Sequence, residues 1–371
     1  MPNPSVRPFA ELRGELARFD AIIDARSTAE YALDHLPGAV NHPTLDDAER
    51  AAVGTLHTTD AFAARRMGAA MAARNIARHI EESFAKHPAH WKPLIYCWRG
   101  GQRSASLAHV LARVGWQVTL IEGGYKAFRR AVIEDLETLP DRLSFRVLCG
   151  ATGSGKSRLL AALARAGGQV LDLEALACHR GSVLGGLPDA PQPAQTAFET
   201  ALWQALQGFD PAQPVWVEAE SKHIGRLRVP EHLMTRIRAS PCTRVDLPTA
   251  ARVQLLIEDY AHLIAHPDQL TERLDALVEL HGHERLAEWR ALTAQGDWEG
   301  LVTRLLVEHY DPAYRRSTGK NYLGLATALP LEVSGLDDFD RAARTLLASA
   351  ADMPPPPERP ARPSSETERQ A

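Results

Sequence analysis

The chain has 371 residues, too many for one ordinary small domain, so two or three domains are expected. Its 45% hydrophobic and 24% charged residues are the balance of a globular protein, and the lack of a long apolar run excludes a bilayer-spanning segment. A net charge of −4 excludes a globally basic nucleic-acid binder, so any RNA contact must come from local basic patches.

The first seven residues lack the apolar core of a signal peptide. The four cysteines have no paired spacing of the metal-site kind, which argues against both a zinc site and a disulfide framework. We therefore predict a cytoplasmic protein with free thiols, no metal site of cysteine ligands and no membrane association.

Residues 8–135 are predicted to form an α/β domain with a mainly parallel sheet, because apolar runs at 19–24, 93–96 and 115–121 alternate with helical patterns. Residues 136–144 are predicted to be a linker. A second α/β domain is expected at 145–348, with strands near its start and a helical region from 250 to 308. The proline-rich segment 349–371 is predicted to be a disordered tail.

A short loop follows the strand at 93–96 and precedes a helical pattern. Its cysteine, Cys97, is the predicted nucleophile, since glycines, two arginines and a helix N-terminus after it form an anion-binding loop that favours the thiolate. The alternative is a buried structural cysteine, but glycines and arginines are poor core residues. The predicted loop residues are Trp98, Arg99, Gly100, Gly101, Gln102, Arg103 and Ser104.

This half of the chain resembles the rhodanese family. The resemblance is carried by the cysteine loop and by the stretches 22–27, 29–31 and 35–41. It implies a cysteine that carries sulfur or selenium, with Asp24 and Arg26 bracing the loop. Rhodaneses usually place the arginine five residues after the cysteine, whereas Arg103 is six residues after Cys97. That longer spacing is the one found in cysteine phosphatases, so the predicted ligand is a phosphate that bears sulfur or selenium.

A second anion-binding loop follows the strand at 145–149 and matches the P-loop pattern in full. Its backbone N–H groups and its lysine are predicted to bind phosphate, and its last serine is placed to hold Mg²⁺ if a nucleotide binds. A P-loop alone does not establish nucleotide hydrolysis. The predicted phosphate-binding residues are Gly150, Gly153, Ser154, Gly155, Lys156 and Ser157.

Acidic residues Asp172, Glu218 and Glu220 end two predicted strands of this domain. Two interpretations stay open: the carboxylates serve a metal ion, or they cap helices and pair with nearby cations. Basic clusters at 222–228 and 310–320 are the predicted tRNA contacts, and the second adds two tyrosines suited to stacking on bases. The predicted tRNA-binding residues are Lys222, Arg226, Tyr310, Tyr314, Arg315, Arg316 and Lys320.

Both halves together, in this order, resemble the tRNA 2-selenouridine synthase family. The resemblance runs over most of the predicted ordered chain and includes the stretches 51–56, 96–104, 122–126, 150–157, 217–225 and 310–314. It implies a transferase that replaces sulfur by selenium in wobble 2-thiouridine of tRNA. Selenophosphate, provided by a separate supplier, would be the selenium donor, and geranyl diphosphate the co-substrate for an S-geranylated intermediate.

Two other functional classes stay open from the residues alone. One is a cysteine phosphatase or a sulfurtransferase fused to a nucleotide-binding regulatory domain. The Cys-x5-Arg-Ser spacing favours the phosphatase. The other is a non-enzymatic sulfur carrier whose partner binding is gated by a nucleotide. Neither accounts for the tyrosines and cations at 310–320.

Overall fold

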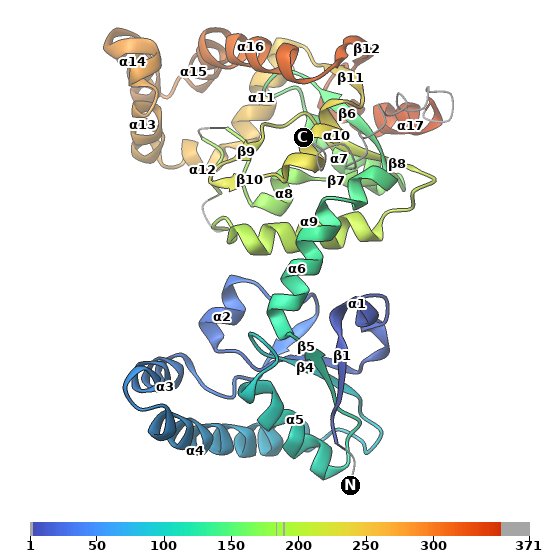
Figure 1. Ribbon diagram of the computed structural model, residues 1–371. Helices are drawn as coiled ribbons and strands as arrows, with labels where there is room; N and C mark the ends of the chain where they lie inside the picture. Colours follow the sequence, from blue (N-terminus) through green and yellow to red (C-terminus); the bar gives the residue numbers. More distant parts are fainter. Residues whose placement is uncertain (1–2, 183, 188–189, 350–371) are drawn as a thin grey trace, which may run out of the picture. The chain divides into compact units, whose positions relative to one another are not determined.

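The computed structural model describes residues 3–182, 184–187 and 190–349, and its side chains are described there except for residues 317–320. The segment 350–371, which holds most of the predicted disordered tail, lies outside the described residues. The chain divides into two compact units (Figure 1). We call Met1–Leu139 with Gln192–Gln207 the first unit, and Pro140–Pro191 with Gly208–Ala371 the second unit.

The first unit is built on a five-stranded parallel sheet with the order β1-β5-β4-β2-β3. Its strands are β1 (Ser5–Pro8), β2 (Ala21–Asp24), β3 (Ala39–Asn41), β4 (Pro93–Tyr96) and β5 (Thr119–Glu122). All four residues of β4 are buried, as expected for the central strand of a parallel sheet covered on both faces. Strand β1 was not predicted; its alternating polar sequence is typical of an edge strand, and it pairs with β5 at the end of the strand order.

Helices cover both faces of this sheet, with α4 and α5 on one side and α6 on the other in Figure 1. Local signals fix their ends: Asp46 and Asp60 cap α3 and α4, and Gly115 ends α5 in the left-handed conformation. The helices are α1 (Phe9–Leu12), α2 (Thr28–Leu33), α3 (Asp47–Thr59), α4 (Ala61–His79), α5 (Gln102–Val114) and α6 (Gly124–Leu136), with short turns η1 (Leu16–Arg18) and η2 (Ile80–Phe84).

A further helix of the first unit comes from much later in the chain. Helix α9 (Gln195–Gly208) donates Trp203 Nε1 to Asp135 at 2.8 Å, and its Trp203 ring packs edge-on against Phe128. Residues 192–207 therefore belong to the first unit, although the sequence placed them inside the second predicted domain. The physical reason is burial: Phe198, Leu202, Trp203 and Leu206 all have 2% exposure or less.

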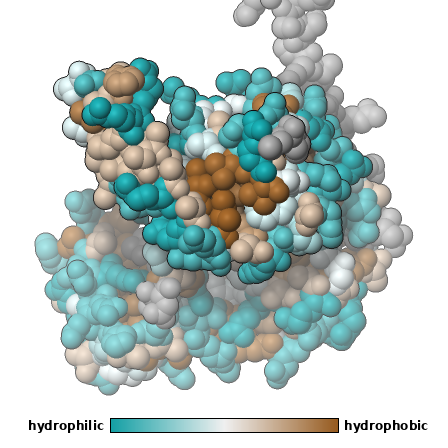
Figure 2. All heavy atoms as spheres, turned by 90° about the horizontal axis from the view of Figure 1, so that it is seen from below, coloured by the Kyte–Doolittle hydropathy of each residue, from teal (hydrophilic) through white to brown (hydrophobic). Residues whose placement is uncertain are grey.

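The first unit also exposes some apolar side chains. Val6 in β1 and Val110 and Val114 in α5 are 60%, 36% and 55% exposed. Figure 2 shows a hydrophobic area among hydrophilic residues on the face seen from below. Among the described residues, no helix combines the length and the apolar composition needed to cross a membrane.

The second unit is built on another five-stranded parallel sheet, with the order β12-β11-β6-β8-β7. The strands β6, β7 and β8 correspond to the strands predicted at 145–149 and at the positions that Asp172 and Glu218 end, whereas β12 and the hairpin β9-β10 were not predicted. The bounds are β6 (Ser144–Cys149), β7 (Gln169–Leu171), β8 (Pro214–Glu218), β9 (His223–Ile224), β10 (Leu227–Arg228), β11 (Pro241–Asp246) and β12 (Gly324–Glu332).

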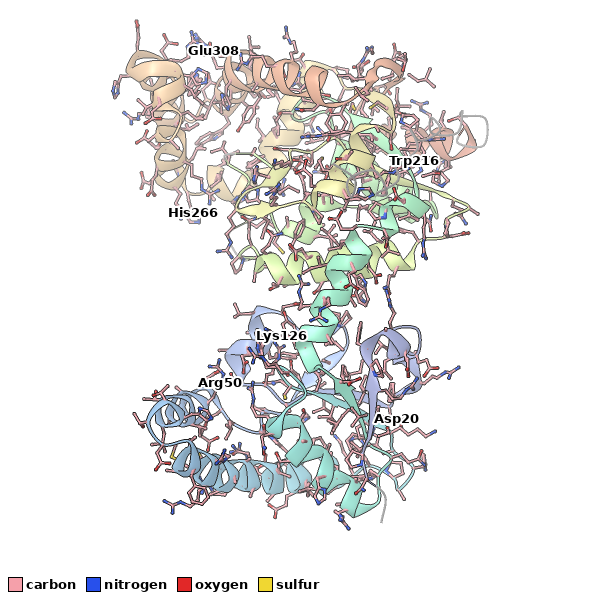
Figure 3. The ribbon with its side chains drawn as sticks, viewed as in Figure 1. Asp20, Arg50, Lys126, Trp216, His266 and Glu308 are labelled. Atoms are coloured by element: carbon pink, nitrogen blue, oxygen red, sulfur yellow. The ribbon has the colours of Figure 1, made fainter. Side chains whose placement is uncertain are left out.

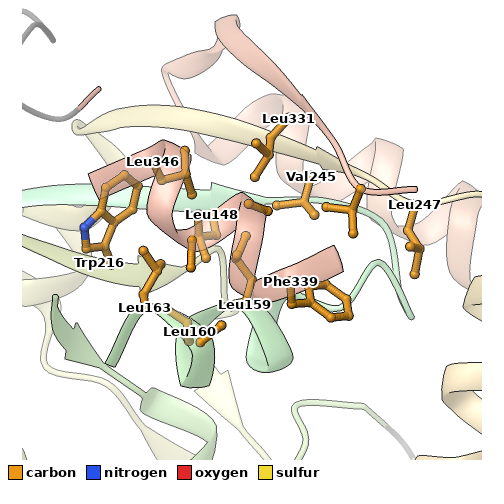
Figure 4. Packing of buried hydrophobic residues seen from close by; sticks show 14 of the residues in the cluster. Leu148, Leu159, Leu160, Leu163, Trp216, Val245, Leu247, Leu331, Phe339 and Leu346 are labelled. Carbon is orange, nitrogen blue, oxygen red and sulfur yellow. The ribbon is translucent and has the colours of Figure 1, made fainter. Parts of the chain in front are cut away.

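Helices α7 and α17 pack together over this sheet, and their apolar faces meet in the core shown in Figure 4. Trp216 from β8, Leu160 from α7 and Phe339 from α17 are buried there. The remaining helices are α8 (Leu173–Ala177), α10 (Glu231–Arg238), α11 (Thr249–Asp259), α12 (Ala261–Ile264), α13 (Pro267–Asp275), α14 (Val278–Gln295), α15 (Trp298–Leu305) and α16 (Asp311–Asn321), beside α7 (Lys156–Arg165) and α17 (Phe339–Ser349). Short turns are η3 (Leu139–Arg142), η4 (Leu306–Tyr310) and η5 (Leu336–Asp338).

Candidate functional site

Cys97 lies directly after the central strand β4 and before α5, at the carboxyl edge of the first unit's sheet. Open parallel sheets bind ligands at this edge, because loops and helix N-termini gather there. The cysteine is 3% exposed, so its thiol lies at the bottom of the loop rather than on the surface. Trp98, Arg99, Gly101 and Gln102 are exposed around it, and Gly100 and Arg103 are partly buried.

The loop around Cys97 packs tightly against the start of α6. The N–H groups of Tyr125 and Lys126 donate to the carbonyls of Cys97 and Trp98, at 2.8 and 3.1 Å. A Cβ atom on Gly124 would lie only 2.2 Å from the Cys97 carbonyl oxygen, and Gly124 has a φ of +58°. Only glycine fits this position, so α6 fixes the cysteine loop from behind.

A buried ion pair lies beneath the loop. Arg26 is 1% exposed and donates through Nη2 to Asp24 at 2.6 Å, and the Tyr96 hydroxyl donates to the same carboxylate at 2.8 Å. Arg26 also lies over the Tyr125 ring, 3.9 Å from its centroid. This arrangement matches the bracing role that the rhodanese resemblance implies for the pair, since it joins β2, β4 and α6.

The Cys97 thiol has one close hydroxyl partner. Ser104 Oγ donates to Cys97 Sγ at 3.1 Å, and Ser104 is fully buried in the first turn of α5. A hydroxyl donor at this distance stabilises negative charge on the sulfur. The sequence placed Ser104 in the loop, and its position makes it a partner of the nucleophile.

Arg103 already has an anionic partner. Its Nη1 contacts Glu30 at 2.6 Å, and Arg50 of α3, labelled in Figure 3, reaches the same carboxylate at 3.1 Å. Partial burial alone would raise the pKa of Glu30, but the hydrogen bond and charge of Arg103 outweigh burial and lower it. Glu30 therefore holds Arg103 beside the loop, a role that the sequence did not assign.

The P-loop of the second unit connects β6 to α7. Lys156 donates from Nζ to the carbonyl of Gly150 at 2.8 Å, so its ammonium group lies across the loop mouth. Gly155 has a φ of +81°, and a Cβ there would lie 2.2 Å from Cζ of Phe339. The loop is thus held between α7 and the start of α17, with Ser154 buried inside it.

Arg252 fixes the loop from the other side. Its Nη2 donates to the Thr152 carbonyl at 2.8 Å and contacts Asp311 at 2.6 Å. Asp311 thus holds Arg252 against the P-loop. It belongs to the stretch 310–314, which was predicted from the sequence to contact tRNA. Arg252 was not among the predicted site residues, because nothing in its helical surroundings marks it as a loop ligand.

Three carboxylates gather below the P-loop. Oxygen atoms of Glu174, Glu218 and Glu220 all lie within 4.8 Å of one another, and the Ser157 hydroxyl oxygen lies 3.1 Å from Glu174 and 3.2 Å from Glu218, so its one proton can be donated to either carboxylate. Burial and the neighbouring Glu220 raise the pKa of Glu174 to about 8. Burial raises the pKa of Glu218 and of Glu220 as well, and the negative charges of Glu174 and Glu220 add to the shift at Glu218.

This carboxylate cluster fits a divalent cation. Glu218 is 1% exposed, and its Oε1 is buried without a hydrogen-bond partner, so an acceptor is left over inside the site. Oxygen donors of this kind, with a P-loop serine hydroxyl, are the ligands that Mg²⁺ prefers. Asp172 is differently placed: it caps α8 by accepting from Ala175 N–H at 2.8 Å. The sequence missed Glu174, although it follows Asp172 by only two residues.

A cavity of about 690 Å³ lies over the P-loop. Residues from distant parts of the second unit line it, among them Lys156, Glu218, Tyr310 and Tyr314. Tyr310 and Tyr314 therefore line the P-loop cavity, and their stacking on RNA bases stays a prediction. Arg315 and Arg316 are exposed on α16, and the Lys320 side chain lies outside the described residues.

The other predicted tRNA cations lie in the β9-β10 hairpin region. Lys222 contacts Glu231 at 3.6 Å, and Arg226 is exposed in the turn between the two strands. An exposed ion pair of this kind contributes little to stability, so a polyanion can replace Glu231 as the partner of Lys222 at little cost.

The fold and the two loops define a protein with a rhodanese-like domain followed by a P-loop domain. The family model for the rhodanese-like domain matches residues 9–131. The family model described as the tRNA 2-selenouridine synthase AAA domain matches residues 143–276.

Proteins named tRNA 2-selenouridine synthase align with most of the chain. The one from Shewanella halifaxensis is 31% identical over 332 residues, which are 81% of this chain and 89% of that protein. The one from Shewanella loihica is 30% identical, covering 85% of this chain and 92% of that protein. The one from Nitrosomonas europaea is 37% identical, covering 64% and 63%. The chain belongs to the tRNA 2-selenouridine synthase family.

Proposed function

We propose that this protein is a tRNA-modifying transferase that replaces sulfur by selenium in wobble 2-thiouridine. Selenophosphate is the selenium donor, and an S-geranylated nucleoside made from geranyl diphosphate is the intermediate. The observation that carries the proposal is the presence of two separate anion-binding loops, one with the buried thiol of Cys97 and one with Lys156 over a cavity.

The first reaction is assigned to the P-loop cavity. The sulfur of 2-thiouridine attacks C1 of geranyl diphosphate, an S–C bond forms, the C–O bond breaks, and diphosphate leaves with the electron pair. Lys156 and the loop N–H groups stabilise the charge on the leaving diphosphate. The carboxylates of Glu174, Glu218 and Glu220 would hold a Mg²⁺ ion, which supplies further charge neutralisation of the diphosphate.

The second reaction uses the cysteine loop. The Cys97 thiolate attacks phosphorus of selenophosphate, the P–Se bond breaks, and selenium leaves as hydrogen selenide anion with the electron pair. Selenide then attacks C2 of the geranylated base and expels geranyl thiolate. Water hydrolyses the phosphocysteine and regenerates the thiol. The Cys-x5-Arg-Ser spacing and the 3.1 Å contact of Ser104 with Cys97 support this role.

Mass spectrometry of wobble nucleosides tests the proposal, after 2-thiouridine tRNA is incubated with the protein and both co-substrates. We expect Cys97→Ala to lose selenation and to keep geranylation, with Cys178→Ala as the matched thiol control. Full selenation by Cys97→Ala would contradict the role of the thiol. A selenated rather than phosphorylated Cys97 peptide would contradict the attack at phosphorus.

The role of the P-loop is tested separately. We expect Lys156→Ala to lower geranylation at least tenfold, because the leaving diphosphate loses its closest cation. Arg165→Ala is the matched control, since Arg165 lies on the same helix with a side chain that is 62% exposed. Unchanged geranylation by Lys156→Ala would remove the P-loop from this step.

A cysteine phosphatase is the second candidate function, favoured by the same Ser104–Cys97 contact. Release of phosphate from a generic aryl phosphate, with a rate that exceeds selenophosphate turnover, would favour it.

A further inference from the structure

A second, smaller cavity adjoins the P-loop cavity within the second unit. Thr152, Leu256, Tyr260 and Tyr310 line both cavities, so the two cavities are neighbours that share these four residues. Beyond them the smaller cavity is walled by leucine, isoleucine, valine and tryptophan side chains of α12, α13, α15 and η4. The proposed reactions assign no role to this smaller cavity.

The chemistry of the two cavities differs sharply. The P-loop side offers an ammonium group and backbone N–H donors, whereas the smaller cavity is lined almost entirely by carbon. Apolar cavities of this kind stay dry and take up hydrocarbon ligands. A nucleoside would leave its ribose and base polar atoms without partners there, which costs free energy. The pair of cavities therefore selects a ligand with a phosphate head and a hydrocarbon tail.

The size of the smaller cavity limits the length of that tail. It measures about 50 Å³. One water-sized group needs roughly 10–15 Å³ of such cavity volume, so the cavity holds about four groups of that size. That number is close to one five-carbon isoprene unit. A tail of two isoprene groups would place its terminal isoprene group in the smaller cavity and its first isoprene group beside Leu256, Tyr260 and Tyr310.

We propose that this apolar cavity is the binding site for the tail of a ten-carbon prenyl diphosphate whose diphosphate lies on the P-loop. The proposal rests on the proposed function and assigns to these residues the selection of the prenyl chain. Val302 and Ile264 are half-buried lining residues, so changes there alter the cavity without removing a core side chain.

Calorimetric binding of geranyl diphosphate and of inorganic pyrophosphate tests the proposal. Wild-type protein should bind geranyl diphosphate at least tenfold more tightly, since only that ligand fills the cavity. Val302→Phe should weaken geranyl diphosphate at least tenfold and leave pyrophosphate within twofold. Val307→Phe is the matched control, because Val307 is 60% exposed and does not line the cavity.

A second variant works in the opposite direction. Ile264→Ala enlarges the cavity and should raise the affinity for farnesyl diphosphate relative to geranyl diphosphate at least fivefold. This variant decides the matter even if Val302→Phe fails to fold. Equal binding of geranyl diphosphate and pyrophosphate by wild-type protein, or an unchanged chain-length preference of Ile264→Ala, would overturn the proposal.

Failure of the proposed function and failure of the tail site give different experimental results. If wild-type protein forms no geranylated nucleoside in tRNA, the proposed function is wrong. If geranylation proceeds and both variants keep wild-type chain-length preference, the proposed function stands and the tail lies elsewhere.

Discussion

The Thr200 hydroxyl donates a 3.1 Å hydrogen bond to the carboxylate of Asp34, 166 residues earlier in the chain. The same carboxylate accepts from the Tyr125 hydroxyl at 2.6 Å, and the Tyr125 N–H holds the Cys97 carbonyl at 2.8 Å. Helix α9 is therefore joined through two hydrogen-bonded residues to the loop that carries the nucleophile. In the sequence, α9 lies between the two segments that form the second unit. It nevertheless belongs to the first unit, where it supports the cysteine loop.

Replacing Thr200 by valine removes this hydrogen bond and keeps the side-chain shape. Asp34 is 3% exposed, and burial raises the pKa of its carboxyl, so it depends on its remaining donors. We expect Thr200→Val to lower the free energy of unfolding of the first unit by about 1 kcal/mol. Urea titration followed by tryptophan fluorescence measures the change, with exposed Thr345→Val as control. An unchanged midpoint for Thr200→Val would show that α9 does not brace the loop.

The buried pair of Asp24 and Arg26 makes a stronger prediction. Asp24→Asn leaves the Arg26 guanidinium charged, 1% exposed and without its carboxylate. We expect Asp24→Asn to lower the free energy of unfolding by about 3–5 kcal/mol, because an uncompensated charge stays buried. The double variant Asp24→Asn/Arg26→Met should recover part of the lost stability, because it no longer buries an unpaired charge. If thermal unfolding shows the double variant to be as unstable as the single one, burial of charge is not the cause.

Gly124 tests the packing behind the cysteine. Gly124→Ala puts a Cβ 2.2 Å from the Cys97 carbonyl oxygen at a positive φ, and we expect it to cost about 3 kcal/mol. Gly101→Ala is the matched control in the same loop, with open space around its Cβ, and should change stability by less than about 1 kcal/mol. Similar thermal unfolding of the two variants would mean that the loop moves without penalty.

The carboxylates under the P-loop predict a pH-dependent effect of Mg²⁺. Burial and Glu220 raise the pKa of Glu174 to about 8 in the folded protein, above its ordinary value of 4.5. The unfolded chain loses this proton first, so stability from this group is complete below pH 4.5 and is lost as pH rises to 8. Mg²⁺ should therefore raise the melting temperature more at pH 8 than at pH 6.

Glu218→Gln serves as the test variant for the same site, because it removes one carboxyl group from the crowded cluster and with it one metal ligand. We expect it to melt higher than wild-type protein at pH 8 without Mg²⁺ and to gain less from added Mg²⁺. Glu258→Gln is the control, since the Glu258 side chain is 44% exposed on α11. An equal Mg²⁺ gain in wild-type protein and Glu218→Gln would exclude Glu218 as a ligand.

Local sequence signals determined much of the fold and both loops. The apolar runs of β4 and β6, each followed by glycines and a helix, define the edge of a parallel sheet and the place of Cys97 and Lys156. Such patterns are readable because strand, loop and helix are consecutive in the chain. The resemblance of these loops to known families also gave the family to which the chain belongs, which the comparisons confirm.

Contacts between distant residues were decided only by the tertiary structure. Glu30 with Arg103, Arg252 with the P-loop, and Glu174 with Glu218 join residues that share no local pattern. Tyr310, predicted to contact RNA, lines the P-loop cavity together with residues from distant parts of the second unit. Helix α9 has an ordinary amphipathic sequence, and only the burial of its apolar face against the first unit places it there. The chain order fixes which groups are available, and packing fixes which of them meet.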